Sequence, residues 1–199
     1  MISRKILPFM LLILFIGCTT EPTQQPKQVK QVSKPKPPNI ILLSIDTLRA
    51  DHLGMYGYNR AVSPTLDKLS RQGHVFCTVN SQSPLTAPAH MSMFTSLYPE
   101  SHQVRNVSDG APTRLSSQIP TLAEQMKNAG YGTIACTDGG NVNNALGFSK
   151  GFDMYGETGA EQFVSLVKVH PRQPWFSFLH TYWVHDPYIV PNPFYKFFD

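Results

Sequence analysis

Residues 38–54 read PNIILLSIDTLRADHLG, and this stretch decides which fold class the sequence predicts. It opens with a short, almost continuous apolar run from Ile40 to Ile45, which ends at Asp46. Runs of this kind are typical of strands that are buried on both faces of a parallel sheet. Because open parallel sheets bind ligands beyond the carboxyl ends of their strands, Asp46 is also a candidate functional residue.

Predicted strands and helices alternate along the rest of the chain. Ser63 and Pro64 are typical of a helix start, whereas Gly73 and Gly130 are typical of the residue that follows a helix. The pattern predicts helices at 63–73, 87–97, 121–129 and 160–169, and further strands at 74–79, 131–137 and 175–182. Such alternation indicates an α/β fold with a mostly parallel sheet sandwiched by helices. About 160 residues make a small domain of this class, so we expect the domain to be C-terminally incomplete.

The first 18 residues predict export from the cytoplasm. Arg4 and Lys5 precede the apolar run Ile6–Ile16, which is shorter than the stretch of about 20 residues that a membrane-spanning helix needs. We therefore expect a cleaved signal peptide. Residues 15–18, FIGC, resemble the lipobox of bacterial lipoproteins, which implies a lipid on Cys18 and attachment to the bacterial cell envelope, at its periplasmic or outer-membrane face. A simple secretory peptide with an incidental cysteine is the alternative.

Residues 19–38 predict a flexible linker, and residues 39–199 the folded domain. The linker is rich in Pro, Gln and Lys and has no apolar period, so it cannot bury a core. Of the net charge of +4, the first 38 residues carry +5, which leaves −1 for the domain. The basic character therefore indicates a leader near anionic lipid and no binding of nucleic acid. Cys77 and Cys136 lie in apolar runs, so we expect both to be buried, while their pairing stays open.

Residues 38–54, together with Tyr56 and Gly57, resemble the opening of sulfatases and their relatives in the alkaline phosphatase superfamily. The resemblance implies an alkaline-phosphatase-like fold in which Asp46, the acid that ends the first strand, binds a divalent metal ion. A carboxylate suits this place, because hard cations prefer oxygen ligands. Thr47 stands where many sulfatases have a second acid, and it is a further candidate ligand. The implied metal is Ca²⁺ for a sulfatase, and Mn²⁺, Mg²⁺ or Zn²⁺ for an enzyme of phosphate esters; on the residues alone, Asp46 could instead cap a turn.

Residues 86–99, TAPAHMSMFTSLYP, resemble the sulfatase signature, in which Cys or Ser precedes Pro, a small residue and Arg, and a helix follows. Thr86 then occupies the position of the nucleophile, which in sulfatases becomes formylglycine, and His90 that of the arginine. Threonine is not a recognised precursor of formylglycine, but a hydroxyl at a helix N-terminus lies where an anionic ester is attracted and where a metal can lower its pKa. We expect Thr86 to react and to contact the metal, and His90 to donate to the ester or to Thr86. Thr86 as an ordinary N-cap is the alternative, and Ser83 is the reserve nucleophile.

Residues 180–188, HTYWVHDPY, resemble the family's His-x-Pro-Tyr segment after a central strand. The resemblance implies that His185 contacts the sulfate or phosphate group, where an imidazole can donate to an ester oxygen or protonate the leaving group. For His180, a structural role is the favoured interpretation. Residues 147–153, GFSKGFD, resemble a turn of the family, and Lys150 within it is either an anion contact or a solvated lysine.

The three motifs occur in the order of the family and predict a metal-dependent hydrolase that acts on sulfate or phosphate esters through Thr86. A phosphoethanolamine or phosphoglycerol transferase of the same superfamily is the first alternative, since the nucleophile there is a threonine. A lipid-tethered binding protein with a degenerate site is the second. We expect the remaining metal ligands and an anion-binding lysine beyond Asp199, and the residues indicate no oligomeric state.

Overall fold

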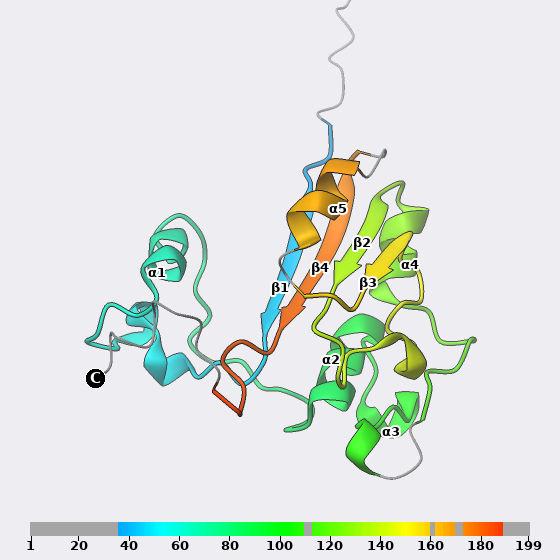
Figure 1. Ribbon diagram of the computed structural model, residues 1–199, viewed down its shortest axis with the longest axis horizontal. Helices are drawn as coiled ribbons and strands as arrows, with labels where there is room; N and C mark the ends of the chain where they lie inside the picture. The colour runs from blue at the N-terminus through cyan, green and yellow to red at the C-terminus, as the bar shows by residue number, and fades with distance from the viewer. Residues whose placement is uncertain (1–35, 110–112, 160–161, 170–172, 189–199) are drawn as a thin grey trace, which may run out of the picture. The chain divides into compact units, whose positions relative to one another are not determined.

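The computed structural model of the protein describes residues 36–109, 113–159, 162–169 and 173–188 (Figure 1). The predicted signal peptide, Cys18 and residues 19–35 of the predicted linker lie outside these residues and remain predictions. None of the described helices is both long enough and apolar enough to cross a membrane.

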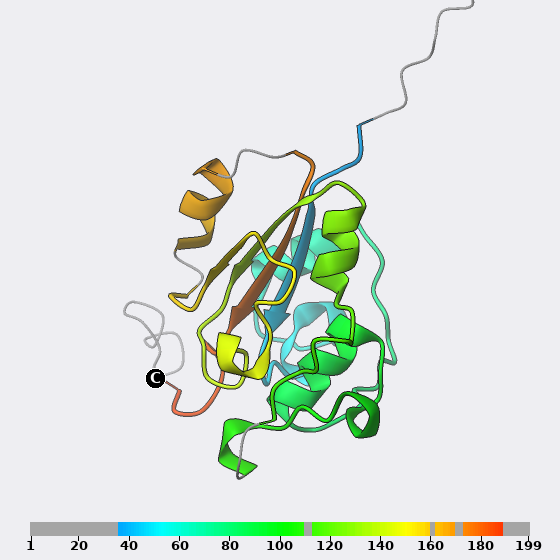
Figure 2. The ribbon, with the colours of Figure 1, turned by 90° about the vertical axis from the view of Figure 1, so that its right-hand side faces the viewer.

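A four-stranded parallel sheet forms the centre of the domain (Figures 1 and 2). All its strand pairs are parallel, with Ile45 opposite Thr181, and the order across the sheet is β1-β4-β2-β3. The parallel sheet that the sequence predicts is therefore confirmed, and one short strand, β3, adds to the predicted set. The strands are β1 (Ile40–Ile45), β2 (Gly132–Cys136), β3 (Met154–Gly156) and β4 (Trp175–Thr181).

Helices cover both faces of this sheet. α2 (Thr86–Thr95) and α4 (Leu122–Asn128) lie on one face, and α5 (Phe163–Val169) lies on the other (Figure 2). A capping box fixes the start of α4, because Thr121 and Glu124 each accept the other's backbone N–H. The other helices are short: α1 (Pro64–Ser70), α3 (Pro99–His102), and the 3₁₀ turns η1 (Ala50–His52), η2 (Gly54–Tyr56), η3 (Val107–Asp109) and η4 (Asn144–Leu146).

The core attaches α2 to the middle of the sheet. Met91 and Phe94 of α2 are buried together with Phe178 of β4. The rings of Phe94 and Phe178 meet edge to face, with centroids 4.8 Å apart. Each such buried side chain stabilises the fold by about 1.5–3 kcal/mol. The packing holds the first turn of α2 at the carboxyl ends of β1 and β4.

Two predictions about apolar runs are wrong. β1 is an edge strand in the described structure, and Ile41 and Leu43 are 55% and 46% exposed, so it is not buried on both faces. Residues 74–79 form no strand, and Phe76 and Cys77 within them are exposed, so the predicted burial of Cys77 is wrong as well. An apolar run becomes a buried strand only where neighbouring elements offer it partners, which residues 74–79 do not find in the described part of the chain. Cys136 is buried, as predicted.

Candidate active site

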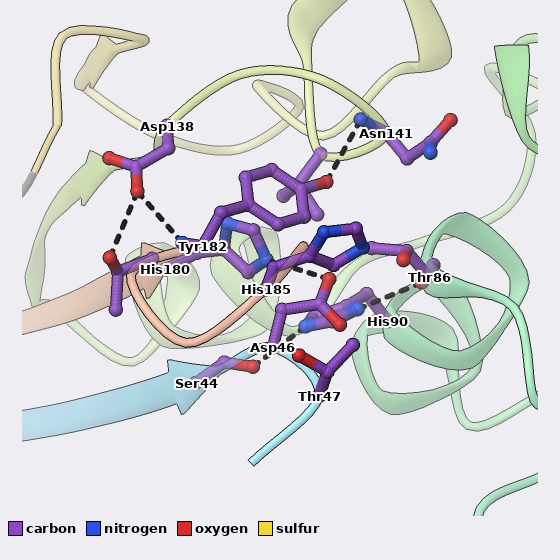
Figure 3. Close-up of polar contacts among 12 residues, drawn as sticks. Ser44, Asp46, Thr47, Thr86, His90, Asp138, Asn141, His180, Tyr182 and His185 are labelled. Carbon is purple, nitrogen blue, oxygen red and sulfur yellow. Dashed lines mark hydrogen bonds and ion pairs between the residues drawn. The ribbon is translucent and has the colours of Figure 1, made fainter. Parts of the chain in front are cut away.

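Asp46 follows β1 directly, and its backbone N–H donates to the carbonyl of Thr181, the last residue of β4, at 2.9 Å. Its carboxylate lies among side chains of β4 and α2 (Figure 3). The side chain is 10% exposed, and Oδ2 has no hydrogen-bond partner. Burial raises the pKa of Asp46, but His180, the Thr86 hydroxyl and His90 together outweigh this effect, so the pKa lies below its ordinary value. Asp46 is therefore an anion at neutral pH, in a position to bind a cation.

Thr86 is the first residue of α2, and Leu85 holds the N-cap position. The Thr86 hydroxyl does not cap the helix, because the side chain of Asn106 accepts the N–H of Ala87 at 2.8 Å. The hydroxyl instead lies close enough to the carboxylate of Asp46 to help lower the pKa of that group. The interpretation of Thr86 as an ordinary N-cap is thus wrong. The fold brings the predicted nucleophile and the predicted metal ligand close together.

Tyr182 also acts near Thr86. Its phenol oxygen accepts the N–H of Asn141 at 3.1 Å. Burial raises the pKa of Tyr182, while the Thr86 side chain acts in the opposite direction without reversing the shift. The carboxylate of Asp46 and the phenol of Tyr182 therefore both interact with the Thr86 side chain.

His90 is bonded to the backbone of Thr86. Its Nδ1 lies 2.8 Å from the carbonyl oxygen of Thr86, and its Nε2 lies 2.7 Å from Oγ of Ser44. Because a carbonyl can only accept, Nδ1 carries the hydrogen and Nε2 accepts from the hydroxyl of Ser44. Burial lowers the pKa of His90, so the ring is neutral at neutral pH. His90 thus donates to Thr86 through the carbonyl oxygen and connects α2 to β1, while its donation to an ester stays a prediction.

The two histidines of the segment 180–188 have different surroundings. His180 is completely buried, and its Nε2 lies 3.5 Å from Oδ2 of Asp46, but neither ring nitrogen makes a hydrogen bond. A separation of 3.5 Å is within ion-pair distance and too long for a well-formed hydrogen bond. His185 is partly exposed, packs edge-on against Tyr182, and donates from Nδ1 to the carbonyl of Asp186 at 2.5 Å. The predicted contact of His185 with a sulfate or phosphate group stays a prediction.

Thr47 and Ser83 are engaged in local structure. The Thr47 hydroxyl donates to the carbonyl of Val184 at 3.1 Å, which connects the end of β1 to the loop after β4. Thr47 adopts a left-handed backbone conformation with φ 57°, which is unfavourable for a β-branched residue. Oγ of Ser83 accepts the N–H of Leu85 at 3.1 Å in the turn before α2. Among the described residues, no side-chain hydrogen bond joins Thr47 or Ser83 to Asp46.

Lys150 is not brought to this group. Its ammonium donates to the carbonyls of Ser117 at 2.8 Å and Ile119 at 2.6 Å, and lies 3.4 Å from the carboxylate of Glu124. The neighbouring Gly151 accepts from Thr133, near the start of β2, whereas the candidate site lies at the strand ends. The three donors of the ammonium are thus used for structure, and the prediction of an anion contact at Lys150 is corrected.

Sequence reasoning missed Asp138. Its carboxylate accepts the Thr181 hydroxyl at 2.9 Å and the N–H of Tyr182 at 2.8 Å (Figure 3). Asp138 therefore holds the end of β4 and the backbone of Tyr182 beside the site. The signal was available, since Asp138 follows β2 closely, much as Asp46 follows β1.

Comparison with known proteins places this site in a family. The family model described as Sulfatase matches residues 38–199. The chain belongs to the sulfatase family. The sulfatase domain is 32% identical over 108 residues to the N-acetylgalactosamine-6-sulfatase of Canis lupus familiaris, a match that covers 49% of this chain and 20% of that protein. The chain thus spans about a fifth of the length of this relative.

Solved structures show the same alkaline-phosphatase-like α/β fold. The phosphonate monoester hydrolase of Agrobacterium radiobacter has a TM-score of 0.63 and 18% identity, over 82% of this chain and 44% of that one. The zinc complex of the C-terminal periplasmic domain of EcEptC from Escherichia coli has a TM-score of 0.62 and 21% identity, over 83% of this chain and 50% of that one. Both likenesses concern the fold of the sulfatase domain.

Members of this superfamily generally use a divalent metal. The sulfatase domain offers some, but not all, of the donor atoms that would bind such an ion. Oδ2 of Asp46 and the ring nitrogens of His180 are buried and lack hydrogen-bond partners, and the Thr86 hydroxyl lies beside them. In the described part of the chain, no three His, Cys, Asp or Glu side chains form a complete cluster for a metal. Asp46 and Thr86 can therefore supply some of the ligands of such an ion, and other ligands must complete it.

Proposed function

We propose that this sulfatase domain belongs to a metal-dependent enzyme that cleaves sulfate or phosphate esters, with Thr86 as the nucleophile and Asp46 as a metal ligand. One observation carries the proposal: the hydroxyl at the start of α2 lies beside the carboxylate that directly follows β1 and helps to lower the pKa of that carboxylate. The helix N-terminus favours the negative charge of a sulfate or phosphate group at this point. A nucleophile, a metal ligand and an anion-binding position therefore coincide.

The residues of the site have separate tasks in this mechanism. A divalent ion bound at Asp46 supplies charge that lowers the pKa of the Thr86 hydroxyl and neutralises ester oxygens. Thr86 gives its proton to solvent water, Oγ attacks the sulfur or phosphorus, a bond from Oγ forms, and the bond to the alcohol oxygen breaks with its electron pair. His185, as an imidazolium, gives the departing alkoxide its Nε2 proton and becomes neutral. In the second step the neutral His185 takes a proton from a water molecule that attacks the same sulfur or phosphorus, and the bond to Oγ breaks with its electron pair, so that Thr86 leaves and takes up a proton from solvent.

Phosphate esters are the second candidate substrates, and the residue at position 86 favours them. Formylglycine forms from Cys or Ser, whereas this chain has threonine. A transferase of phosphoethanolamine or phosphoglycerol differs from a hydrolase only in the last step, in which an acceptor hydroxyl takes the place of water. A binding protein without turnover would retain the metal site alone.

Substitution of Thr86 tests the proposal. In Thr86→Ala the nucleophile is absent, and we expect turnover of the responsive ester to fall on the order of 10³-fold or more. Thr86→Ser keeps the hydroxyl and should stay within about 10-fold of the wild type. Initial rates of the full chain on a panel of aryl sulfates, phosphate monoesters and phosphodiesters make the measurement.

The substrate panel separates the candidate functions. Turnover of sulfate esters alone identifies a sulfatase, and turnover of phosphodiesters alone identifies phosphoryl chemistry. Full activity in Thr86→Ala would exclude Thr86 as the nucleophile. Metal binding with no turnover of any ester would support the binding protein.

A further inference from the structure

His180 carries the strongest unexplained feature of the site. Its side chain is completely buried in β4, yet neither of its ring nitrogens makes a hydrogen bond. Oδ2 of Asp46 lies 3.5 Å from Nε2 of His180, and this oxygen also lacks a partner. Leaving a buried polar atom unpaired costs about 1–3 kcal/mol, and more for a charged group. Two adjacent unpaired atoms that face each other point to a ligand between them.

The neighbouring side chains do not fill this position. Both nitrogens of His90 are used, by Thr86 and Ser44, although its ring lies edge-on to His180 with centroids 5.0 Å apart. The ring of Tyr182 packs edge-on against the other side of His180, with centroids 4.6 Å apart. The imidazole of His180 is thus packed between two rings, which fix its orientation but provide no hydrogen-bond partner for its nitrogens.

The charge at this point requires a cation. The side chains that act on the charge of Asp46 are His180, Thr86 and His90, and none of them is a lysine or an arginine. A carboxylate that is 10% exposed therefore lacks a permanent counter-charge from these neighbours. Buried charges in proteins are paired with an opposite charge or coordinate a metal.

We propose that His180 is a direct ligand of the divalent metal that the proposed function places at Asp46, so that the site binds through nitrogen as well as oxygen. The inference rests on the proposed function only for the presence of the ion. Metal bonds to nitrogen and oxygen are about 2.0–2.2 Å long, so one ion can reach both Nε2 of His180 and Oδ2 of Asp46 across 3.5 Å. Imidazole suits Zn²⁺ and other transition metals, whereas Ca²⁺ takes oxygen ligands. The site therefore prefers Zn²⁺ or Mn²⁺ to Ca²⁺.

Metal titration of the full chain tests this assignment without any use of activity. His180→Gln places an amide oxygen near the position of Nε2, and we expect it to weaken Zn²⁺ binding on the order of 100-fold while it keeps the affinity for Ca²⁺ within about 3-fold. His102→Gln is the matched control, because His102 is also buried but has both ring nitrogens bonded, to Ser92 and Val104. The control should keep the affinity for both metals.

Pulsed electron paramagnetic resonance of bound Mn²⁺ gives a second readout. An imidazole ligand produces a nitrogen modulation, which we expect in the wild type and in His102→Gln but not in His180→Gln. A modulation and a Zn²⁺ affinity that are unchanged in His180→Gln would overturn the inference and would mean that a water fills the unpaired position.

The failure of the inference and that of the proposed function are distinguishable. If Asp46→Asn abolishes metal binding while His180→Gln does not change it, His180 is not a ligand but the proposed function stands. If His180→Gln abolishes nitrogen modulation while Thr86→Ala keeps full turnover, His180 is a ligand but the proposed mechanism fails. A wild-type chain that binds none of Zn²⁺, Mn²⁺ and Ca²⁺ overturns both.

Discussion

At the scale of single residues, the Thr86 hydroxyl lies between Asp46 and Tyr182, both of which interact with it. Tyr182 is itself held by the N–H of Asn141, and its backbone by Asp138. We expect these two polar neighbours to restrict the rotation of the hydroxyl, which lowers the entropy lost on reaching the transition state.

Tyr182→Phe removes the phenol hydroxyl and keeps the ring. We expect kcat to fall by about 3- to 10-fold, the equivalent of one polar interaction with Thr86, with KM little changed. Steady-state kinetics on the best ester of the panel measure the effect. Tyr155→Phe is the control, because the Tyr155 hydroxyl donates to the carbonyl of Val142 and Thr86 is not among the groups that act on it. Equal kcat in Tyr182→Phe and the wild type would refute the orienting role.

At the scale of elements, His90 connects α2 to β1 through a hydrogen bond with the hydroxyl of Ser44. This hydrogen bond requires a neutral imidazole, because Nε2 must accept the hydrogen of the Ser44 hydroxyl. Burial lowers the pKa of His90, while its bond to the Thr86 carbonyl acts in the opposite direction without reversing the shift. The unfolded chain therefore takes up a proton at higher pH than the folded chain does.

The free energy of unfolding should consequently decrease as the pH falls below about 6.5, the ordinary pKa of histidine, and should not change through His90 above it. His90→Gln cannot titrate, so it should lose less stability than the wild type between pH 7.5 and pH 5.5. Urea denaturation at both pH values measures the difference. The same slope in the wild type and in His90→Gln would show that His90 does not contribute.

Packing between α4 and the loop before β3 depends on Gly151. A Cβ at Gly151 would lie 2.4 Å from the backbone nitrogen of Glu124, and its φ is +90°. Gly130 has nearly the same φ, +91°, but a Cβ there would meet nothing within 4 Å. The two glycines therefore share the backbone strain of a substitution and differ only in crowding.

Gly130→Ala should reduce the free energy of unfolding by about 1–2 kcal/mol, through the left-handed backbone alone. Gly151→Ala should cost about 1–3 kcal/mol more, because α4 must also move. Chemical denaturation of both variants gives the comparison. Equal decreases in the free energy of unfolding in the two variants would mean that the first turn of α4 can move away from the new Cβ without a loss of stability.

At the scale of the whole molecule, we propose that the protein is exported and anchored to the cell envelope by a lipid on Cys18. Cells that express the full chain should incorporate labelled fatty acid into it, and Cys18→Ala should abolish the label. Cys77→Ala is the control, since Cys77 is an exposed thiol of the domain and should leave the label unchanged. Labelled Cys18→Ala would contradict the proposal.

The sequence by itself determined the elements that have strong local signals. The apolar run that ends at Asp46 predicted β1, and Gly130, a residue typical of the position after a helix, closed the predicted helix 121–129 in which α4 lies. These signals act between residues that are close in the chain. The match of residues 38–199 to the sulfatase family agrees with the three motifs that carried the resemblance.

Only the tertiary structure decided what each side chain of the site does. Asp46, Thr86 and His180 are distant in sequence, and their meeting depends on the parallel pairing of β1 with β4 and on the packing of α2 against Phe178. The same packing uses both nitrogens of His90 and leaves those of His180 unpaired. Sequence patterns could not separate these two histidines, because hydrogen bonding in a buried site is set by neighbours that long-range contacts supply.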